Sequence, residues 1–476
     1  MNVKFIGFPE AVLKTKPTKG KTVKKVLWGD WTVVLEEKGN YRKIKCRGAY
    51  GWVHKDKLQD NRLLEINFID VGQGDGCYIV TPKDEIIIVD AGEEDNMYRF
   101  LRWRYNLNRN RFIVPIKHLI ISHPDQDHYY GFRHLVNSKR FNIENVYHNG
   151  IVERKGEHTL GEKEDGFLVD IANTHKKVVD IVTDDILRGR KRYPTLLNNV
   201  LKNHPNAILK MLKKDDEIEN YGKNDDVFLK VLGPVTTTKN NKLALKYLNN
   251  DGETKNGHSV IVQLQFDKIK VLLGGDTNDA SEAYLSEHYT GFNPLTVSEA
   301  DREEMITKGR AVFQSDILKS CHHGSHKFLD DFLSFFNPVA TIISSGDNET
   351  HTHPRPDTLG TIGKHSRGVR PLIFSTELAR SAKEKTEIKE KEILKLAKLY
   401  VERKAASGDE KKKISKKIDQ LKYSLQRNIA VYGMINVRTD GEKVIIAQKK
   451  EASGAGFIIY ELHPNVNGEL EYTVKK

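Results

Sequence analysis

Four side chains that bind metal ions lie within six residues, directly after an apolar run. The run spans residues 112–121, and His123, Asp125, Asp127 and His128 follow it. Imidazoles and carboxylates delivered by a buried strand need a partner, because each is costly to bury alone. Zinc and manganese accept both ligand types together. The spacing predicts a metal centre; a helix N-terminus capped by Asp and His is the alternative.

The elements that must position this loop are short apolar strands separated by glycine-rich turns. A strand near residues 268–273 ends in Gly275-Asp276, and one near residues 317–321 ends in His322-His323. Strand ends that present polar groups in this way are typical of a site at one edge of a sheet. Further strands are predicted near residues 64–71, 77–80, 85–89, 227–233, 259–264, 338–343, 430–446 and 457–462, and helices near residues 97–105, 195–203 and 207–212.

The pattern His123-x-Asp125-x-Asp127-His128 after an apolar strand resembles the signature of the metallo-β-lactamase superfamily. Aspartate in place of the second histidine is typical of the ComEC-type metallohydrolase branch. Asp-Val-Gly-Gln-Gly-Asp at residues 70–75 and Val-Asp-Ala-Gly at residues 89–92 are similar to motifs of that branch. The resemblance, which covers residues 63–354 and the final hairpin, implies an α/β fold, the αββα sandwich. It also implies two divalent metal ions, Zn or Mn, and the carboxylate at position 125 favours manganese more than imidazole would.

The same resemblance assigns roles to individual residues. Asp276 would bridge both metals, and one of the His322-His323 pair would bind the second metal, with strand direction favouring His322. His258 lies where the superfamily has a further ligand and is either a ligand or a supporting group. The implied metal ligands are His123, Asp125, Asp127, His128, His258, Asp276 and His322. The implied catalytic residues are Asp127, His323 and His353, and the implied supporting residues are Asp75, Asp90 and Ser325.

The chain divides into two predicted parts. Residues 1–60 contain short strands and hairpin turns that resemble a bacterial SH3-like β-barrel, which would be a binding module. Residues 61–476 form the hydrolase domain, with an insertion near residues 151–226 and a charged helical hairpin near residues 383–425. The hairpin is either a solvated surface or an arm that docks a protein partner.

Composition limits the class of protein. No apolar run approaches the ~20 residues of a membrane span, and the first residues lack the features of a signal peptide. The three cysteines are scattered, which argues against a disulfide framework and predicts a reducing, cytoplasmic setting. The net charge of +12 suits a polyanionic partner, although a solvated surface explains it equally well.

Together these features predict a metal-dependent phosphodiesterase. The expected reaction is cleavage of DNA, with single strands slightly preferred, by a hydroxide that two metal ions activate. Two alternatives remain open. The substrate is a small phosphodiester, such as a cyclic nucleotide or a phosphorylcholine ester, or the chain is a non-catalytic scaffold that binds nucleic acid or protein.

Overall fold

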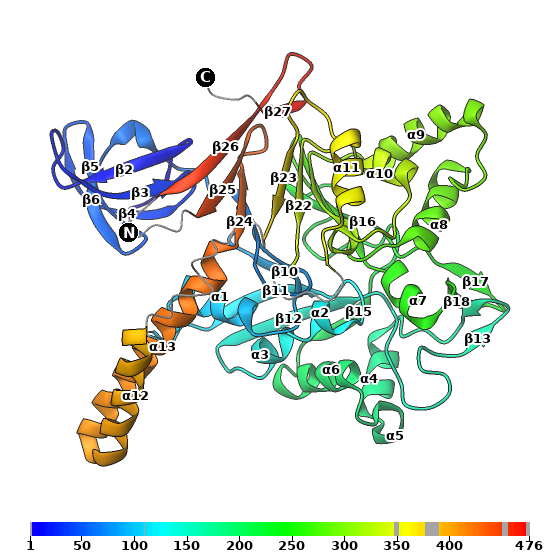
Figure 1. The fold of residues 1–476 in the computed structure, drawn as a ribbon, viewed down its shortest axis with the longest axis horizontal. Helices are drawn as coiled ribbons and strands as arrows, with labels where there is room; N and C mark the ends of the chain where they lie inside the picture. Colours follow the sequence, from blue (N-terminus) through cyan, green and yellow to red (C-terminus); the bar gives the residue numbers. More distant parts are fainter. Residues whose placement is uncertain (1, 109, 347–351, 377–389, 450–455, 473–476) are drawn as a thin grey trace.

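Two β-sheets pack face to face in the centre of the molecule, and helices cover their outer faces (Figure 1). The computed structural model describes residues 2–108, 110–346, 352–376, 390–449 and 456–472. The four layers, helix, sheet, sheet and helix, confirm the predicted α/β sandwich, and a separate all-β unit precedes it.

The first sheet has the strand order β15-β12-β11-β10-β9-β8-β24-β25-β26-β27. Strands β10, β11, β12 and β15 run parallel, so their carboxyl ends share one edge. The bounds are β8 (Leu64–Phe68), β9 (Gly76–Val80), β10 (Ile86–Ala91), β11 (Val114–Ile120), β12 (Phe141–His148), β15 (Ile208–Met211), β24 (Ile435–Thr439), β25 (Val444–Lys449), β26 (Phe457–Pro464) and β27 (Leu470–Tyr472).

The second sheet has the order β16-β19-β20-β21-β22-β23, and its last four strands run parallel. A small sheet, β13-β14-β18-β17, lies beside the sandwich. The bounds are β13 (Lys163–Glu164), β14 (Phe167–Leu168), β16 (Val227–Gly233), β17 (Thr237–Lys239), β18 (Lys242–Lys246), β19 (Ile261–Phe266), β20 (Ile269–Leu273), β21 (Ile317–Lys319), β22 (Ala340–Ile343) and β23 (Leu372–Ser375).

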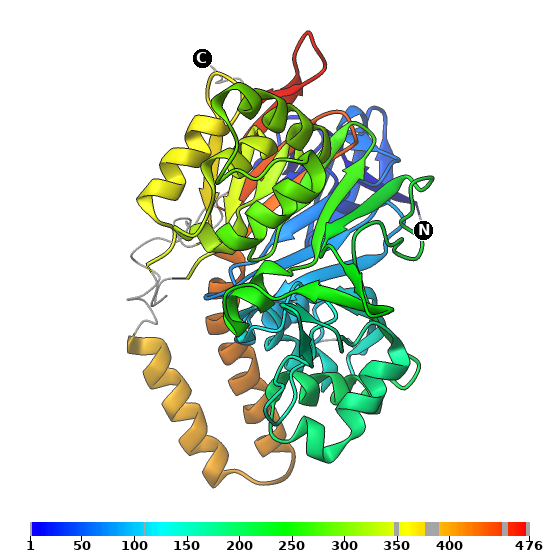
Figure 2. The ribbon, with the colours of Figure 1, turned by 90° about the vertical axis from the view of Figure 1, so that its right-hand side faces the viewer.

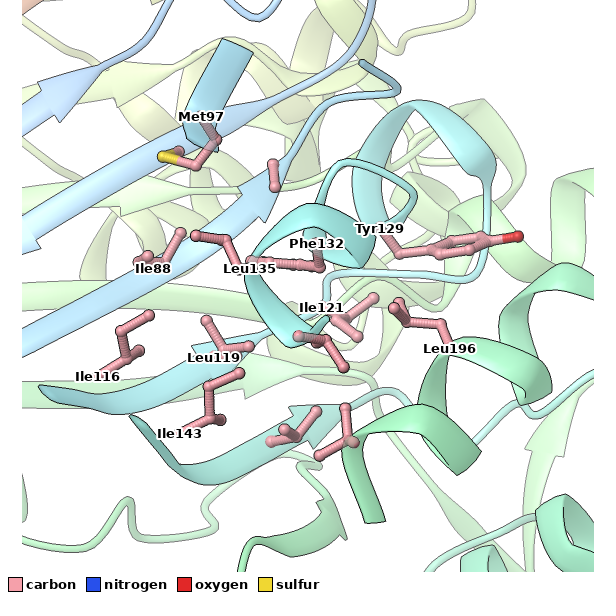
Figure 3. Packing of buried hydrophobic residues seen from close by; sticks show 14 of the residues in the cluster. Ile88, Met97, Ile116, Leu119, Ile121, Tyr129, Phe132, Leu135, Ile143 and Leu196 are labelled. Carbon is pink, nitrogen blue, oxygen red and sulfur yellow. The ribbon is translucent and has the colours of Figure 1, made fainter. Parts of the chain in front are cut away.

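Three apolar layers hold the sandwich together. Between the sheets, side chains such as Ile79 and Val271 pack in one cluster. On the outer face of the first sheet, Ile88 and Leu119 meet Phe132 and Leu135 of α3 (Figure 3). The second sheet packs in the same way against α8, α9, α10 and α11. The helices are α1 (Asn96–Arg104), α2 (Gln126–Tyr129), α3 (Phe132–Val136), α4 (His175–Thr183), α5 (Asp185–Arg188), α6 (Arg192–Asn203), α7 (Asp251–Gly257), α8 (Asp279–Thr290), α9 (Glu299–Phe313), α10 (Asp330–Phe336) and α11 (Pro356–His365).

The helix predicted near residues 207–212 is wrong. Residues Ile208–Met211 form strand β15, which pairs in parallel with β12. Their side chains alternate between exposed and buried, with Leu209 and Met211 buried. That period of two is the signature of a strand at the sheet edge, and it outweighs the helix propensity of the segment.

Two antiparallel helices, α12 (Glu390–Ala405) and α13 (Gly408–Tyr432), project from the sandwich (Figures 1 and 2). They correspond to the charged segment predicted near residues 383–425, of which residues 383–389 lie outside the described part. A small apolar contact that includes Leu399, Ile414 and Ile418 joins them, and α13 packs on α1. Among the described residues, no helix has the length and apolar character needed to cross a bilayer.

The all-β unit forms its own sheet between Val3 and Gln59, in the order β3-β2-β6-β5-β4-β1-β7. Buried side chains such as Leu13, Val26 and Ile44 form its core. The unit docks on the sandwich, where Leu27 and Trp28 pack against Ile445 and Ala447 of β25. The bounds are β1 (Val3–Ile6), β2 (Glu10–Lys14), β3 (Thr22–Leu27), β4 (Trp31–Lys38), β5 (Tyr41–Cys46), β6 (Ala49–His54), η1 (Lys55–Lys57) and β7 (Leu58–Gln59).

A buried ion network fixes this docking. Arg438 on β24 is 2% exposed and donates to Asp30 Oδ1 at 2.8 Å and to the carbonyl of Trp28. Its other guanidinium nitrogen lies 3.5 Å from Glu65, which Arg104 binds with two hydrogen bonds. Arg438 is therefore an electrostatic link between the all-β unit and the first sheet.

We expect Arg438→Met to lower the free energy of unfolding by about 3 kcal/mol, because it leaves buried carboxylates with one fewer partner. Urea denaturation measures this. Arg42→Met is the matched control, since Arg42 pairs with a largely exposed Glu37 and its loss costs at most about 1 kcal/mol. Equal losses in the two variants would contradict the linking role of Arg438.

Candidate metal centre

Loops from both sheets converge on one buried cluster. His128 lies in α2, the short helix that follows β11, whereas Asp276 follows β20 and His323 follows β21. Asp276 Oδ2 lies 3.2 Å from His128 Nε2 and 3.1 Å from His323 Nε2. The two Nε2 atoms are 3.3 Å apart. The cluster therefore places a carboxylate oxygen between two imidazole nitrogens.

Hydrogen bonds to the far side of each ring fix which nitrogen faces the cluster. His128 Nδ1 lies 2.9 Å from Asp90 Oδ2, and His323 Nδ1 lies 3.0 Å from the carbonyl oxygen of Ser344. Carboxylate and carbonyl oxygens accept, so both Nδ1 atoms carry the hydrogen. In the neutral rings, the Nε2 lone pairs therefore point at each other and at Asp276, which is the orientation that metal ligands adopt.

This arrangement needs positive charge. Burial alone would lower the pKa of His128, but Asp276, Asp90 and Asp127 raise it well above its usual value. Burial would raise the pKa of Asp276, yet the imidazoles of His128 and His323 hold it well below its usual value. A proton on an imidazole therefore takes the place of a cation, and Asp276 Oδ1 is buried without a hydrogen bond. The residues fit a metal ion.

The predicted residue Asp127 joins the same cluster, with Oδ2 3.6 Å from His323 Nε2. Gly74 allows this approach, because a Cβ at that position would meet the Asp127 carbonyl oxygen at 1.6 Å and its φ is +98°. Among the described residues, four overlapping groups have all their ligand atoms within 4.8 Å of one another. Two of them are His123, His128 and Asp276, and Asp127, His128 and His323; the other two join Asp75 to Asp90 and His128, and Asp75 to Asp276 and His323.

The other half of the centre contains His123, Asp125 and Asn256. His123 Nε2 lies 3.7 Å from Asp125 Oδ2. The Asn256 side chain reaches both, at 3.3 Å from His123 Nε2 and 2.6 Å from Asp125 Oδ2, in the orientation where its amide nitrogen donates. Lys255 pairs with the second oxygen of Asp125.

The predicted supporting residues Asp75 and Asp90 contact the cluster directly. Asp90 accepts hydrogen bonds from Ser122 and His128, and Asp75 Oδ1 lies 3.2 Å from His323 Nδ1. Asp75 also forms a buried ion pair with Lys319, whose Nζ lies 3.9 Å from Asp276. Lys319 therefore balances part of the negative charge of the cluster.

The histidine pair differs from its prediction. His323, not His322, faces Asp276, Asp127 and His128; His322 Nε2 is 4.0 Å from Asp276 and its side chain is 20% exposed. The backbone of both has positive φ, 45° and 52°, a conformation that costs non-glycine residues about 1–3 kcal/mol. In this turn the His323 ring, and not the His322 ring, faces Asp276, so the geometry favours His323 as ligand. His353 lies beside the pair, with ring centroids 5.9 Å from His322 and 6.2 Å from His323.

Two predicted residues do not reach the cluster. His258 Nε2 lies 2.6 Å from the carbonyl oxygen of Lys246, so this nitrogen carries a hydrogen and faces away from the centre. His258 ends α7, and the next residue, Ser259, contacts His123 instead, with 3.3 Å between Oγ and Nδ1. Ser325 Oγ accepts from the backbone of Lys327, and in the described residues it has no bond to a cluster side chain.

Several site residues escaped the sequence prediction. Lys319 ends the apolar strand β21 and is 3% exposed; a charge inside an apolar run was the available signal. Asn256 lies in a polar stretch beside the predicted His258. The contributions of Ser122 Oγ and the Ser344 carbonyl have no sequence signal, because hydroxyls and backbone oxygens at strand ends are common.

Comparison with known proteins agrees with this geometry. Residues 76–200, which include His123, Asp125, Asp127 and His128, match the model of the metallo-beta-lactamase superfamily. The match spans 125 of the 476 residues of the chain. No curated protein sequence matches the chain.

Among solved structures, the Zn²⁺-bound PqqB from Methylobacterium extorquens is similar at 6% identity. The similarity covers 65% of this chain and 97% of PqqB, with a TM-score of 0.31. At that level of similarity it carries no argument about this chain.

We expect His323→Ala to weaken zinc binding more than His322→Ala. Loss of a group that only orients a ligand costs about 10–100-fold in metal affinity, so loss of the ligand itself costs about 100-fold or more. Zinc titration of chelator-stripped protein by calorimetry measures both variants, with Cys321→Ala as a neighbouring control. A larger loss in His322→Ala would show that the exposed histidine is the ligand.

Proposed function

We propose that this chain is a metal-dependent phosphodiesterase that cleaves DNA, single strands more readily than duplex, and that it holds two divalent ions, Zn or Mn. The observation that carries the proposal is the position of Asp276 between the Nε2 atoms of His128 and His323. A carboxylate shared by two ligand groups is the feature that two-metal hydrolysis requires. The ions would supply Lewis acidity and a nucleophile at neutral pH.

The side chains of the centre divide into ligands and substrate-facing groups. His123, Asp127, His128, Asp276 and His323 would hold the ions. His322 and His353 lie on the more exposed side of the cluster, where a scissile phosphate would approach. An imidazole there donates a proton to the departing oxygen or a hydrogen bond to a phosphate oxygen. Lys255 neutralises Asp125 and limits the anionic charge that would repel a phosphodiester.

The choice of DNA rests on charge. The chain has a net charge of +12. A basic protein gains affinity for a polyanion with every phosphate that it neutralises, because counterions are released. A cyclic nucleotide or phosphorylcholine ester carries a single phosphodiester and gains little from charges far from the centre. A polymeric substrate therefore uses the charge distribution of the whole molecule.

We expect Asp276→Asn to lower the rate of DNA cleavage by about 10³-fold or more, because several kcal/mol of transition-state stabilisation depend on the shared carboxylate. Labelled single-stranded, linear and circular DNA are incubated with metal-loaded protein, and products are separated by gel. Asp279→Asn removes the same charge three residues away, outside the cluster, and is expected to retain activity.

Salt separates the substrate classes. Cleavage of DNA is expected to fall steeply with added salt, whereas hydrolysis of a cyclic nucleotide or a phosphorylcholine ester is expected to change little. Hydrolysis of the small esters with no cleavage of any DNA would overturn the choice of DNA. Equal rates for the wild type and Asp276→Asn would overturn the metal-dependent mechanism.

A further inference from the structure

The N-terminal all-β unit carries most of the chain's excess positive charge. Residues 1–60 contain fourteen Lys and Arg and six Asp and Glu, a net charge of +8, while the whole chain has +12. The other 416 residues therefore contribute only +4. Positive charge concentrated on one small unit is the electrostatic footprint of a polyanion-binding surface.

A groove of about 340 Å³ opens on this unit, lined by residues of β2, β5, β6 and η1. Tyr41, Trp52 and His54 supply aromatic rings, and Lys14 and Lys57 supply ammonium groups. The Tyr41 and His54 rings meet edge to face, with centroids 5.3 Å apart. Lys14 pairs with Trp52 across adjacent strands, so charge and aromatic surface lie side by side.

The positive charge in the groove is available to a ligand. Glu10, the carboxylate in its lining, already pairs with Lys25 at 3.0 Å. Within the described part of the chain, no carboxylate lies within ion-pair distance of Lys14 or Lys57, whereas Lys4 pairs with Asp60. The exposed Lys16 and Lys19 lie in the turn that contains Pro17, another lining residue, and add to the same edge.

The groove stays open when the unit docks on the sandwich. The docking contact uses Leu27 and Trp28, with Asp30 in the ion network, and none of these lines the groove. Ala11 and Val53 line the groove and also belong to the core of the unit, and Trp52 is 9% exposed, so these residues serve the fold as well. Tyr41 and His54 lie outside that core cluster and are only partly buried, so their rings remain accessible to a ligand.

We propose that this groove binds single-stranded nucleic acid. Unpaired bases present flat faces that stack on aromatic rings such as Tyr41, and their phosphates suit the ammonium groups of Lys14 and Lys57. Paired bases are stacked within a duplex and cannot enter in this way. The inference goes beyond the proposed hydrolysis, because binding here needs neither the metal ions nor the cluster around Asp276.

The test measures binding of the full chain to fluorescein-labelled oligothymidylate and oligouridylate of about 16 nucleotides, in EDTA, by fluorescence anisotropy. We expect Lys14→Gln/Lys57→Gln to reduce the slope of log K against log salt by about 1.4, since each phosphate contact contributes about 0.7 for single strands. Tyr41→Ala is expected to weaken binding about tenfold, and Tyr41→Phe to preserve it, because the stacking face remains.

The matched control is Lys4→Gln/Lys24→Gln, which removes two charges from the same unit outside the groove and is expected to leave the slope nearly unchanged. An equal change in both double variants would overturn the groove as the site. Tighter binding of a duplex than of a single strand would also overturn it. So would displacement of the labelled oligonucleotide by polyphosphate or polyglutamate as effectively as by an unlabelled oligonucleotide of equal charge.

Hydrolysis of bis(p-nitrophenyl) phosphate by metal-loaded protein separates this inference from the proposed function. The groove variants are expected to keep the wild-type rate, because the small ester does not need the groove. If the wild-type chain does not bind the oligonucleotides in EDTA, the inference is overturned, whatever the rate of hydrolysis. Absence of hydrolysis, with binding intact, would instead count against the proposed function alone.

Discussion

The buried carboxylate of Asp276 cannot lie between two imidazole nitrogens without positive charge. Three buried side chains, Asp276, His128 and His323, come from loops far apart in the sequence and meet within 3.3 Å. A buried charge without compensation costs far more than a surface ion pair gains. Only a proton or a cation makes the contact between Asp276 and the two imidazoles favourable. The proton or cation that supplies this charge therefore also holds the segments from the two sheets together. The fold and the chemistry of the centre depend on the same electrostatic requirement.

The sandwich satisfies this requirement through the ends of its strands. Parallel strands bring their carboxyl ends to one edge, and the groups that orient the rings come from those same ends. Asp90 ends β10 and Ser344 follows β22, and each fixes a histidine through Nδ1. Lys319, at the end of β21, offsets negative charge through Asp75. Most of the supporting groups are thus part of rigid elements, which keeps ligand positions well defined whether or not an ion is bound.

Local sequence spacing was sufficient to predict where the side chains from His123 to His128 lie, because a single apolar strand delivers all of them to one place. The predicted fold class, by contrast, came from the family resemblance of the motifs, while the apolar runs indicated only where strands lie. Local spacing was insufficient where geometry depends on backbone torsions: His322 and His323 both have positive φ, and the ring nearer to Asp276 is that of His323. It left His258 open between a ligand and a supporting group, and the structure turns this imidazole toward Lys246 at the end of α7. It was wrong at Ile208–Met211, where pairing with β12 decides the structure. These outcomes are set by tertiary contacts that neighbouring residues do not encode.

The docking of the all-β unit bears on how a polymer would reach the centre. Because Arg438 is buried and binds Asp30 and Trp28, the unit is held by a desolvated ion network and an apolar contact, not by a flexible linker. The separation between the groove and the metal centre is then a fixed length. A fixed distance raises the affinity for nucleic-acid strands long enough to occupy both sites at once, because the second contact is then intramolecular. Short ligands reach only one site and gain no affinity in this way. If both sites bind nucleic acid, the rigid junction at Arg438 makes substrate length a determinant of affinity, a property that neither site has alone.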